Sequence, residues 1–254
     1  MKTATAVTSR APDGLSAPSL RPVQWKRLRE QLAILNESDP ARVLDAAFSV
    51  GDALGGMSEE RQLRRFLQSE SGQKILAEGP SLCEALADSE TLAAMPPGSL
   101  GRHFLAFSER HSLDPRALVE SQHRMSRDYA QLDPLRQYLR DRSTVMHDLW
   151  HVLVGYDATP AGESALMCFS LPQRVNDRAL PIFVLMSVFT GKLRFANAVE
   201  AIRRGRQAEA LFSQPFERLL PLRLEEVRRK LGITPPTEAH AGRNTAELLI
   251  PVED

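Results

Sequence analysis

Two histidines and two acidic residues lie close together in the sequence at spacings that suit metal binding. His147, Asp148 and His151 fall within the segment His-Asp-Leu-Trp-His, and Glu163 follows after a gap of eleven residues. Side chains three or four positions apart share one face of an α-helix, so the first three can converge on one small volume. The turn-rich segment 155–160 can fold the chain back and bring Glu163 against the imidazoles. The spacing predicts a site of two histidines with one or two carboxylates.

Imidazole nitrogens and carboxylate oxygens suit zinc, and iron or manganese also accept these ligands. The pattern is similar to the helical motif of zinc proteases, with Asp148 in place of the glutamate. Because aspartate is one methylene shorter, it reaches a metal-bound water less easily, and we interpret Asp148 as a ligand or as a residue that orients one. Three or four protein ligands leave a coordination position open for a substrate oxygen, which is typical of catalytic sites.

Two other interpretations of these residues stay open. In the first, the histidine pair is tied to Asp148 in the core, and Glu163 is favoured only by the helix dipole in the first turn of a helix after Pro160. In the second, the chain is a metal phosphohydrolase that combines the adjacent His-Asp pair with His123 and Asp177. That class requires neither the second histidine four residues on nor Glu163, so the spacing disfavours it.

The rest of the chain offers few other chemical motifs. The remaining histidines are weaker candidates, in surface or capping positions: His103, His111, His123 and His240. The sequence has no glycine-rich phosphate cradle, nucleophile elbow or paired CxxC motif, so nucleotide binding and acyl-enzyme chemistry have no support.

Composition restricts the class of protein. The 254 residues include 32 basic and 32 acidic side chains, so no global field attracts nucleic acid or an anionic membrane, and we expect no nucleic-acid partner. The two cysteines, Cys83 and Cys168, are far apart, which fits a cytoplasmic or matrix-like reducing compartment better than a disulfide framework. Residues 1–20 contain no apolar block, so we expect neither a secretory signal nor a membrane anchor there.

The elements that must position these residues are helices. Apolar residues recur at three- and four-residue spacing from about residue 42 onward, and breakers such as Asp114-Pro115, Asp133-Pro134 and Gly191 divide the stretches. We expect a compact, irregular all-α fold of seven or more helices in one domain. The predicted organisation is a flexible N-terminal tail over 1–39, a helical domain over 40–240 and a polar tail over 241–254.

The apolar run 180–189 is too short for the roughly 20 residues that cross a bilayer. As a helix it is apolar all round, so it must lie in the core, in an oligomer such as a homodimer, or against lipid. The core position is the most common outcome for such a helix. If the helix faces lipid, it offers these side chains: Ile182, Phe183, Leu185 and Met186.

The chain resembles the coenzyme Q biosynthesis protein 4 family. The pattern His-Asp-x-x-His, eleven residues, then Glu resembles the signature of that family. The segment 97–102 is similar to the one that precedes the signature in the family, and the segment 231–234 is similar to its closing helix end. The resemblance covers roughly residues 40 to 240.

The resemblance implies an all-helical fold, a hydrophobic groove for a polyprenyl tail, and a zinc site whose ligands would be His147, Asp148, His151 and Glu163. It implies ubiquinone synthesis at the surface of an inner or cytoplasmic membrane, on a polyprenylated aromatic precursor and together with other enzymes of the pathway. The activity associated with the family is oxidative decarboxylation, which replaces the carboxylate at ring C1 of a polyprenylated hydroxybenzoate by hydroxyl. The alternative is a non-catalytic scaffold that uses the metal for structure and its apolar groove to hold lipid or partner enzymes.

Overall fold

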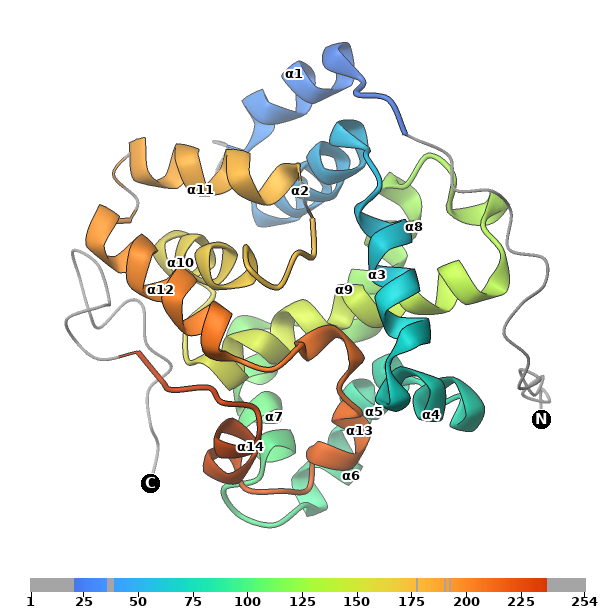
Figure 1. The fold of residues 1–254 in the computed structure, drawn as a ribbon, viewed down its shortest axis with the longest axis vertical. Coiled ribbons are helices and arrows are strands. Elements are labelled where there is room, and N and C mark those ends of the chain that lie inside the picture. Colours follow the sequence, from blue (N-terminus) through green and yellow to red (C-terminus); the bar gives the residue numbers. More distant parts are fainter. Residues whose placement is uncertain (1–20, 36–38, 177, 190, 192, 237–254) are drawn as a thin grey trace.

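The longest helix among the described residues, α9 (Pro134–Val154), runs through the middle of the molecule (Figure 1). Asp133 caps its first turn, because the carboxylate accepts hydrogen bonds from the amides of Leu135 and Arg136, and Pro134 takes the first helical position. The helix ends at Gly155, whose φ of +90° lies in the left-handed region that favours glycine. The Asp133-Pro134 breaker predicted from the sequence is therefore confirmed as a helix start.

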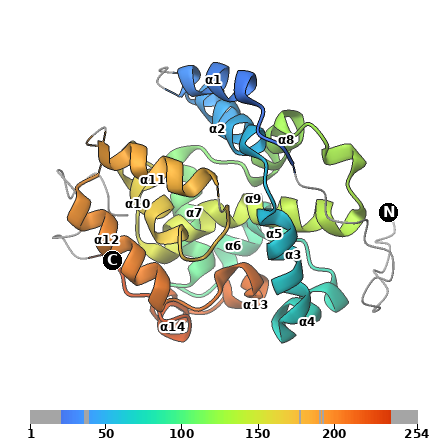
Figure 2. The same cartoon turned by 45° about the horizontal axis from the view of Figure 1, so that its top comes forward.

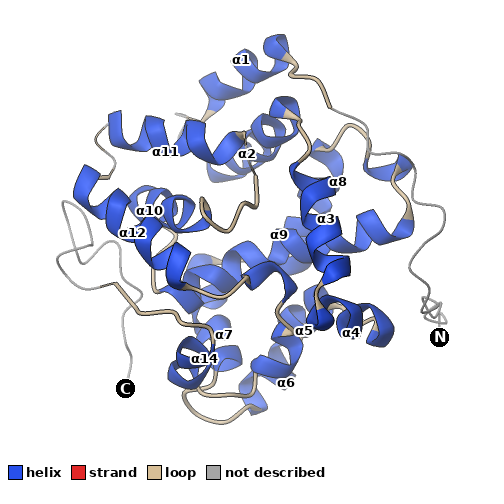
Figure 3. Cartoon of the chain, viewed as in Figure 1, coloured by secondary structure: helices blue, strands red, loops and turns tan. Residues whose placement is uncertain are grey.

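The computed structural model describes residues 21–35, 39–176, 178–189, 191 and 193–236. Across these ranges the regular structure is entirely helical and contains no strand (Figure 3), which confirms the predicted compact all-α fold. The helices other than α9 are α1 (Trp25–Ile34), α2 (Pro40–Leu54), α3 (Ser58–Gln68), α4 (Glu70–Glu78), α5 (Leu82–Ala87), α6 (Ser89–Ala94), α7 (Leu100–His111), α8 (Pro115–Met125), α10 (Pro160–Ser170), α11 (Ala179–Phe189), α12 (Phe195–Gln207), α13 (Phe216–Leu219) and α14 (Leu224–Lys230).

The main hydrophobic core surrounds α9. This helix contacts α3, α5, α7, α8, α10 and α14, and the view in Figure 2 shows it enclosed by them. Leu149 and Leu153 of α9 are fully buried, together with Phe104 from α7, Phe169 from α10 and Val227 from α14. Burial of such side chains stabilises the fold by about 1.5–3 kcal/mol each. The helix that carries both histidines is consequently held from several sides.

The N-terminal part of the described chain corrects one expectation. Residues 25–34, predicted to belong to a flexible tail that ends at residue 39, form α1, which packs on α2. Leu28 is buried there in a second, smaller core, with Leu32 and Leu35 partly buried beside it. The reason is an amphipathic stripe, since these leucines recur four and three positions apart. Residues 1–20 and the predicted polar tail 241–254 lie outside the described residues.

The apolar helix α11 lies at the side of the molecule. The expectation that this helix lies in the central core is therefore wrong. Val184 and Val188 pack against the main core, and Phe183 packs against the smaller core of α1 and α2. Four large side chains face outward: Ile182, Leu185, Met186 and Phe189, with exposed fractions of 40%, 58%, 43% and 81%. A helix that is apolar all round is therefore covered on only part of its circumference. Among the described residues, no helix has the length and apolar character needed to cross a membrane.

Candidate metal centre

Helix α9 presents the two histidines one turn apart on the face that meets α10. His151 is buried, with a side chain only 1% exposed, whereas the His147 side chain is 46% exposed. The ring of Phe107, from α7, stacks on the His151 ring at a centroid distance of 5.6 Å. One histidine is thus fixed in the core, and the other lies at the protein surface.

Helix α10 brings the carboxylate. Thr159 caps it by accepting a hydrogen bond from the Gly162 amide, and Pro160 occupies the first helical position. Gly162 is required here, because a Cβ at this position would lie 1.9 Å from the backbone oxygen of Asp157. Glu163 lies in the first turn, where the helix dipole favours a negative charge. The turn after Gly155 therefore places Glu163 where the sequence predicts it.

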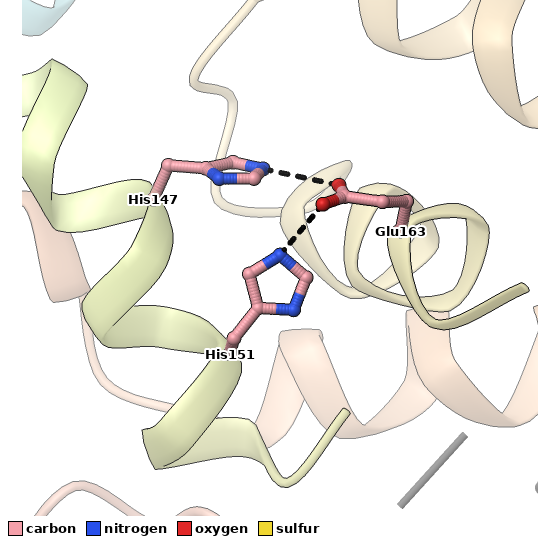
Figure 4. Close-up of side chains that lie close together, drawn as sticks. All are labelled: His147, His151 and Glu163. Atoms are coloured by element: carbon pink, nitrogen blue, oxygen red, sulfur yellow. Dashed lines mark ion pairs between the residues drawn. The ribbon is translucent and has the colours of Figure 1, made fainter. Parts of the chain in front are cut away.

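Both histidines direct Nε2 at the same carboxylate (Figure 4). His151 Nε2 lies 3.1 Å from Glu163 Oε1, and His147 Nε2 lies 3.4 Å from Glu163 Oε2. One ligand atom from each of the three residues falls within 4.8 Å of the others. Two atoms bound to zinc at about 2.0–2.1 Å in tetrahedral geometry lie about 3.3 Å apart. The two separations between a histidine nitrogen and a carboxylate oxygen therefore match those of neighbouring ligands on one ion.

The opposite ring nitrogens are held by acceptors. His151 Nδ1 lies 3.0 Å from the carbonyl oxygen of Tyr156, which can only accept, so Nδ1 carries the proton. His147 Nδ1 lies 3.2 Å from Asp148 Oδ1. A neutral ring would then direct an Nε2 lone pair at a carboxylate oxygen, which is repulsive unless a proton or a metal ion lies between them. The buried His151 Nε2 has an ion-pair contact with Glu163 but no hydrogen bond among the described residues, so the residues present fit a divalent metal.

In the metal-free protein the same geometry shifts the pKa of His147 and the pKa of Glu163. Burial disfavours the charged form of His147, but attraction to Glu163 and hydrogen bonds to Asp148 and Glu163 outweigh it and raise the pKa of His147 to about 10. Burial also disfavours the charged form of Glu163, yet the two histidines lower the pKa of this carboxyl well below its usual range. These shifts favour an anionic Glu163 with a positive charge beside it.

The structure separates Asp148 from the other three predicted ligands. Its carboxylate contacts His147 at Nδ1, on the opposite side of the ring from Glu163, and it is not part of the group of three. This contact fits the orienting role, and the ligand role stays a prediction.

His123, the more distant histidine of the phosphohydrolase interpretation, is not part of this group of three. His123 contacts Asp141 through Nε2 at 2.7 Å and stacks on the ring of Tyr129. Asp177 lies outside the described residues. Of the other weaker candidates, His103 contacts the carbonyl of its own helix cap Ser99, and His111 pairs with Asp157. His240 is also outside the described residues.

Two arginines, the buried Arg204 and the partly buried Arg228, hold the C-terminal end of α9. Arg204, on α12, donates to the carbonyl oxygen of Val154 and to the hydroxyl of Tyr156. The backbone carbonyl of the same tyrosine orients His151. Arg228, on α14, donates to the carbonyl oxygens of Leu153 and Val152. These bonds satisfy carbonyls that a helix end leaves without partners, and they add positive charge where the dipole is negative.

A predominantly apolar cavity of about 100 Å³ adjoins the cluster, and His147 is part of its wall. It lies between α9, α10 and the start of α11, and its lining includes Met146, Trp150, Leu166 and Leu180. A larger cavity of about 330 Å³ lies among α5, α8 and α9, but it shares no lining residue with the cluster. The smaller cavity is therefore the one relevant to the chemistry of the metal-binding group.

Fold and site together define a class: an all-helical protein with a two-histidine, one-carboxylate group beside an apolar cavity. The family model for coenzyme Q (ubiquinone) biosynthesis protein Coq4 matches residues 19–237. The chain belongs to this family, as its sequence motifs predict, and coenzyme Q biosynthesis is therefore its field of action. The match also includes α1, which the motif resemblance from residue 40 onward does not reach.

Individual relatives agree with this assignment. A Xenopus tropicalis protein named as a mitochondrial COQ4 homolog is 26% identical over 228 residues, covering 86% of this chain and 77% of its own. The corresponding Danio rerio protein is 27% identical over 202 residues, covering 76% and 70%. A crystal structure of a Nostoc punctiforme protein assigned to ubiquinone biosynthesis is 20% identical and superposes with a TM-score of 0.56. It covers 83% of this chain and 99% of that protein, so the two share a fold.

Proposed function

We propose that this protein is a metal-dependent enzyme of coenzyme Q biosynthesis that acts at ring C1 of a polyprenylated hydroxybenzoate. In this reaction the bond from C1 to the carboxylate breaks, carbon dioxide leaves, and one oxygen atom of dioxygen becomes the new hydroxyl. Two electrons and two protons from an external donor reduce the other oxygen atom to water. The observation that carries the proposal is the convergence of two Nε2 atoms and one carboxylate on one point beside an apolar cavity.

The roles of the residues follow from their contacts. His147, His151 and Glu163 would hold the metal, with zinc proposed first and iron or manganese as alternatives of the same ligand type. The metal would supply Lewis acidity toward a carboxylate or phenolic oxygen of the ring. Asp148 and the Tyr156 carbonyl fix the two ring orientations and increase the basicity of the histidines. Because zinc is redox-inert, a zinc enzyme would rely on the electron-rich ring to react with dioxygen.

The exposed apolar side chains support a peripheral contact with a membrane. We define the α11 surface as Ile182, Leu185, Met186 and Phe189, continued on α12 by Phe195 and Val199, all of them exposed. Exposed large apolar side chains on two helices that contact each other are typical of lipid or partner contact. The α11 surface supports binding of the polyprenyl tail and of the membrane surface, with Phe183 packed behind it against the smaller core. Tail burial would contribute about 0.8 kcal/mol per methylene.

The test is release of labelled carbon dioxide from a prenylated hydroxybenzoate that carries the label in its ring carboxylate. We expect turnover by the wild-type protein and loss of turnover in His147→Ala. The matched control is His103→Ala, on α7, which removes a histidine outside the cluster. Equal release by the wild type and His147→Ala would contradict the proposal.

The exposed α11 surface also favours a second function, that of a scaffold for lipid and for other ubiquinone-biosynthesis proteins. A scaffold would use the metal for structure and would not need turnover at the cluster. Complementation of cells that lack the protein therefore distinguishes the two functions. If His147→Ala restores ubiquinone synthesis as fully as the wild type, while substitutions on α11 do not, the scaffold function holds and the enzymatic one fails.

A further inference from the structure

The indole N–H of Trp150 is a buried hydrogen-bond donor that the fold leaves without an acceptor. Trp150 is on α9, three residues after His147 and directly before His151. The residue is 4% exposed, and its Nε1 atom makes no hydrogen bond to the described residues. Buried tryptophans ordinarily bond this N–H, because leaving it unpaired in the interior destabilises the fold. The exception therefore calls for an acceptor that does not come from the described part of the chain.

The position of Trp150 indicates where that acceptor comes from. Trp150 and His147 both line the cavity of about 100 Å³ beside the metal-binding group, as expected for two residues one turn apart on one helix face. Most of the lining is apolar, with a few polar side chains such as Ser143 and Ser170. In pockets of this composition a small number of directional polar groups fix the orientation of the ligand. The Trp150 N–H is suited to be one of them.

The size and surroundings of the cavity suit one ring rather than a long chain. Benzene binds in a protein cavity of about 150 Å³, which is of the same order as this one. Leu180 of α11 forms part of the wall, so the cavity adjoins the helix whose outer face is the α11 surface. A ring placed beside His147 could thus extend its tail toward exposed apolar side chains.

We infer that the Trp150 indole N–H donates a hydrogen bond to an oxygen substituent of an aromatic substrate ring bound in this cavity. The inference rests on the proposed function, and it names the group that recognises the ring oxygen by a hydrogen bond. It makes Trp150 a specificity-determining residue, because a site built to bond an oxygen rejects the analogue that lacks it. The phenolic or carboxylate oxygen would select a hydroxybenzoate over an equally flat hydrocarbon ring.

The first test removes only the N–H. Trp150→3-benzothienylalanine replaces the indole nitrogen by sulfur and keeps the size and shape of the ring system. We expect the affinity for 4-hydroxybenzoate, used at millimolar concentration as a tailless probe, to fall about 10-fold. Toluene, which has no oxygen, should bind the variant and the wild type equally. The matched control is the same replacement at Trp25, which is 73% exposed on α1 and should leave both affinities unchanged.

The second test observes the N–H directly. The chain has two tryptophans, so a Trp25→Phe protein has a single indole N–H resonance, that of Trp150. Adding 4-hydroxybenzoate should move this resonance downfield, as hydrogen bonding does, whereas toluene should not. No shift with the hydroxybenzoate, or equal affinity in the benzothienyl variant, would overturn the inference. A shift produced by a prenyl alcohol and not by the ring would also overturn it, because the cavity would then hold the tail.

These measurements are independent of turnover. If the ring binds and shifts Trp150 but no labelled carbon dioxide is released, the proposed reaction fails while the binding role of Trp150 stands. If turnover proceeds and the benzothienyl variant binds and converts the substrate like the wild type, the proposed reaction stands and the role of Trp150 fails.

Discussion

The metal-binding group and the α11 surface lie close in the fold but differ in how their side chains are supported. At the metal-binding group each histidine has one ring nitrogen held by an acceptor, and the helix that carries both is fixed by neighbours on several sides. On the α11 surface the large side chains are covered on one side only. The difference teaches that this fold gives rigidity to the residues suited to chemistry and leaves exposed those suited to lipid contact.

Removing the carboxylate that both histidines contact should have the largest effect, and it should affect metal binding alone. Glu163→Gln should weaken metal binding more than about 100-fold, since even partners outside the ligand set contribute about 10–100-fold. Binding to vesicles should not change, because Glu163 is not part of the α11 surface. Competition with a chromophoric chelator measures the metal affinity. The control is Glu90→Gln, an exposed glutamate that also lies in the first turn of its helix. An equal loss in both variants would refute the assignment of Glu163.

Polar substitutions on the α11 surface should weaken lipid contact and leave metal binding unchanged. Leu185→Ser combined with Phe189→Ser should reduce partitioning onto phospholipid vesicles by at least about 100-fold, since each large apolar side chain contributes about 1.5–3 kcal/mol when buried. Metal content should stay at the wild-type level. Vesicle co-sedimentation checks the first result, with Leu44→Ser on α2 as the control for an exposed leucine elsewhere. Unchanged partitioning in the double variant would remove the lipid role from α11.

The pH dependence of metal binding sharpens the comparison, because it depends on the protons of the site. In the metal-free protein the pKa of His147 is raised to about 10, so its proton stabilises the fold fully below the unfolded value of about 6.5. That contribution is lost as the pH rises toward the folded pKa. A metal ion must displace this proton, and apparent affinity should therefore increase about tenfold per pH unit while the pH stays below the folded pKa.

Solvent screening at the half-exposed His147 reduces the size of this shift, but the increase should continue through pH 8. Isothermal titration in chelator-buffered zinc over pH 6 to 8.5 gives the slope. An affinity that levels off near pH 6.5 would show that Glu163 does not hold a proton on His147.

The smallest effect distinguishes the two interpretations of Asp148. An amide oxygen still accepts a hydrogen bond from His147 Nδ1, so Asp148→Asn should weaken metal binding by no more than about 10-fold if this residue only orients the ring. The same competition assay provides the measurement. A loss as large as that of Glu163→Gln would instead make Asp148 a fourth ligand.

Local spacing explains what the sequence could predict. The His147 and His151 pair follows from helical periodicity, and Glu163 follows from a turn and a capped helix start that involve neighbouring residues only. The contacts that complete the site were not predictable in this way. Phe107 lies 44 residues before His151, and Arg204 lies 50 residues after Val154, whose carbonyl it binds. Such partners are set by packing rather than by local pattern.

Helix α11 shows the same limit for the fold. Its uniformly apolar sequence identified a helix too short to span a bilayer, but periodicity carries no information on which side the core lies. The prediction of a tail before residue 40 was wrong for another reason. The stripe of Leu28, Leu32 and Leu35 that indicates α1 is present in the sequence and was not used. Exposure of α11 could be learned only from the arrangement of its neighbours.

The central claim is that a divalent cation bound by His147, His151 and Glu163 is required for activity. Native mass spectrometry of protein purified without added metal, combined with turnover of the same preparation, tests it most directly. The account predicts one bound divalent ion per active chain, and loss of both the ion and turnover in the double variant His147→Ala, His151→Ala. A fully active preparation without any bound cation would contradict it.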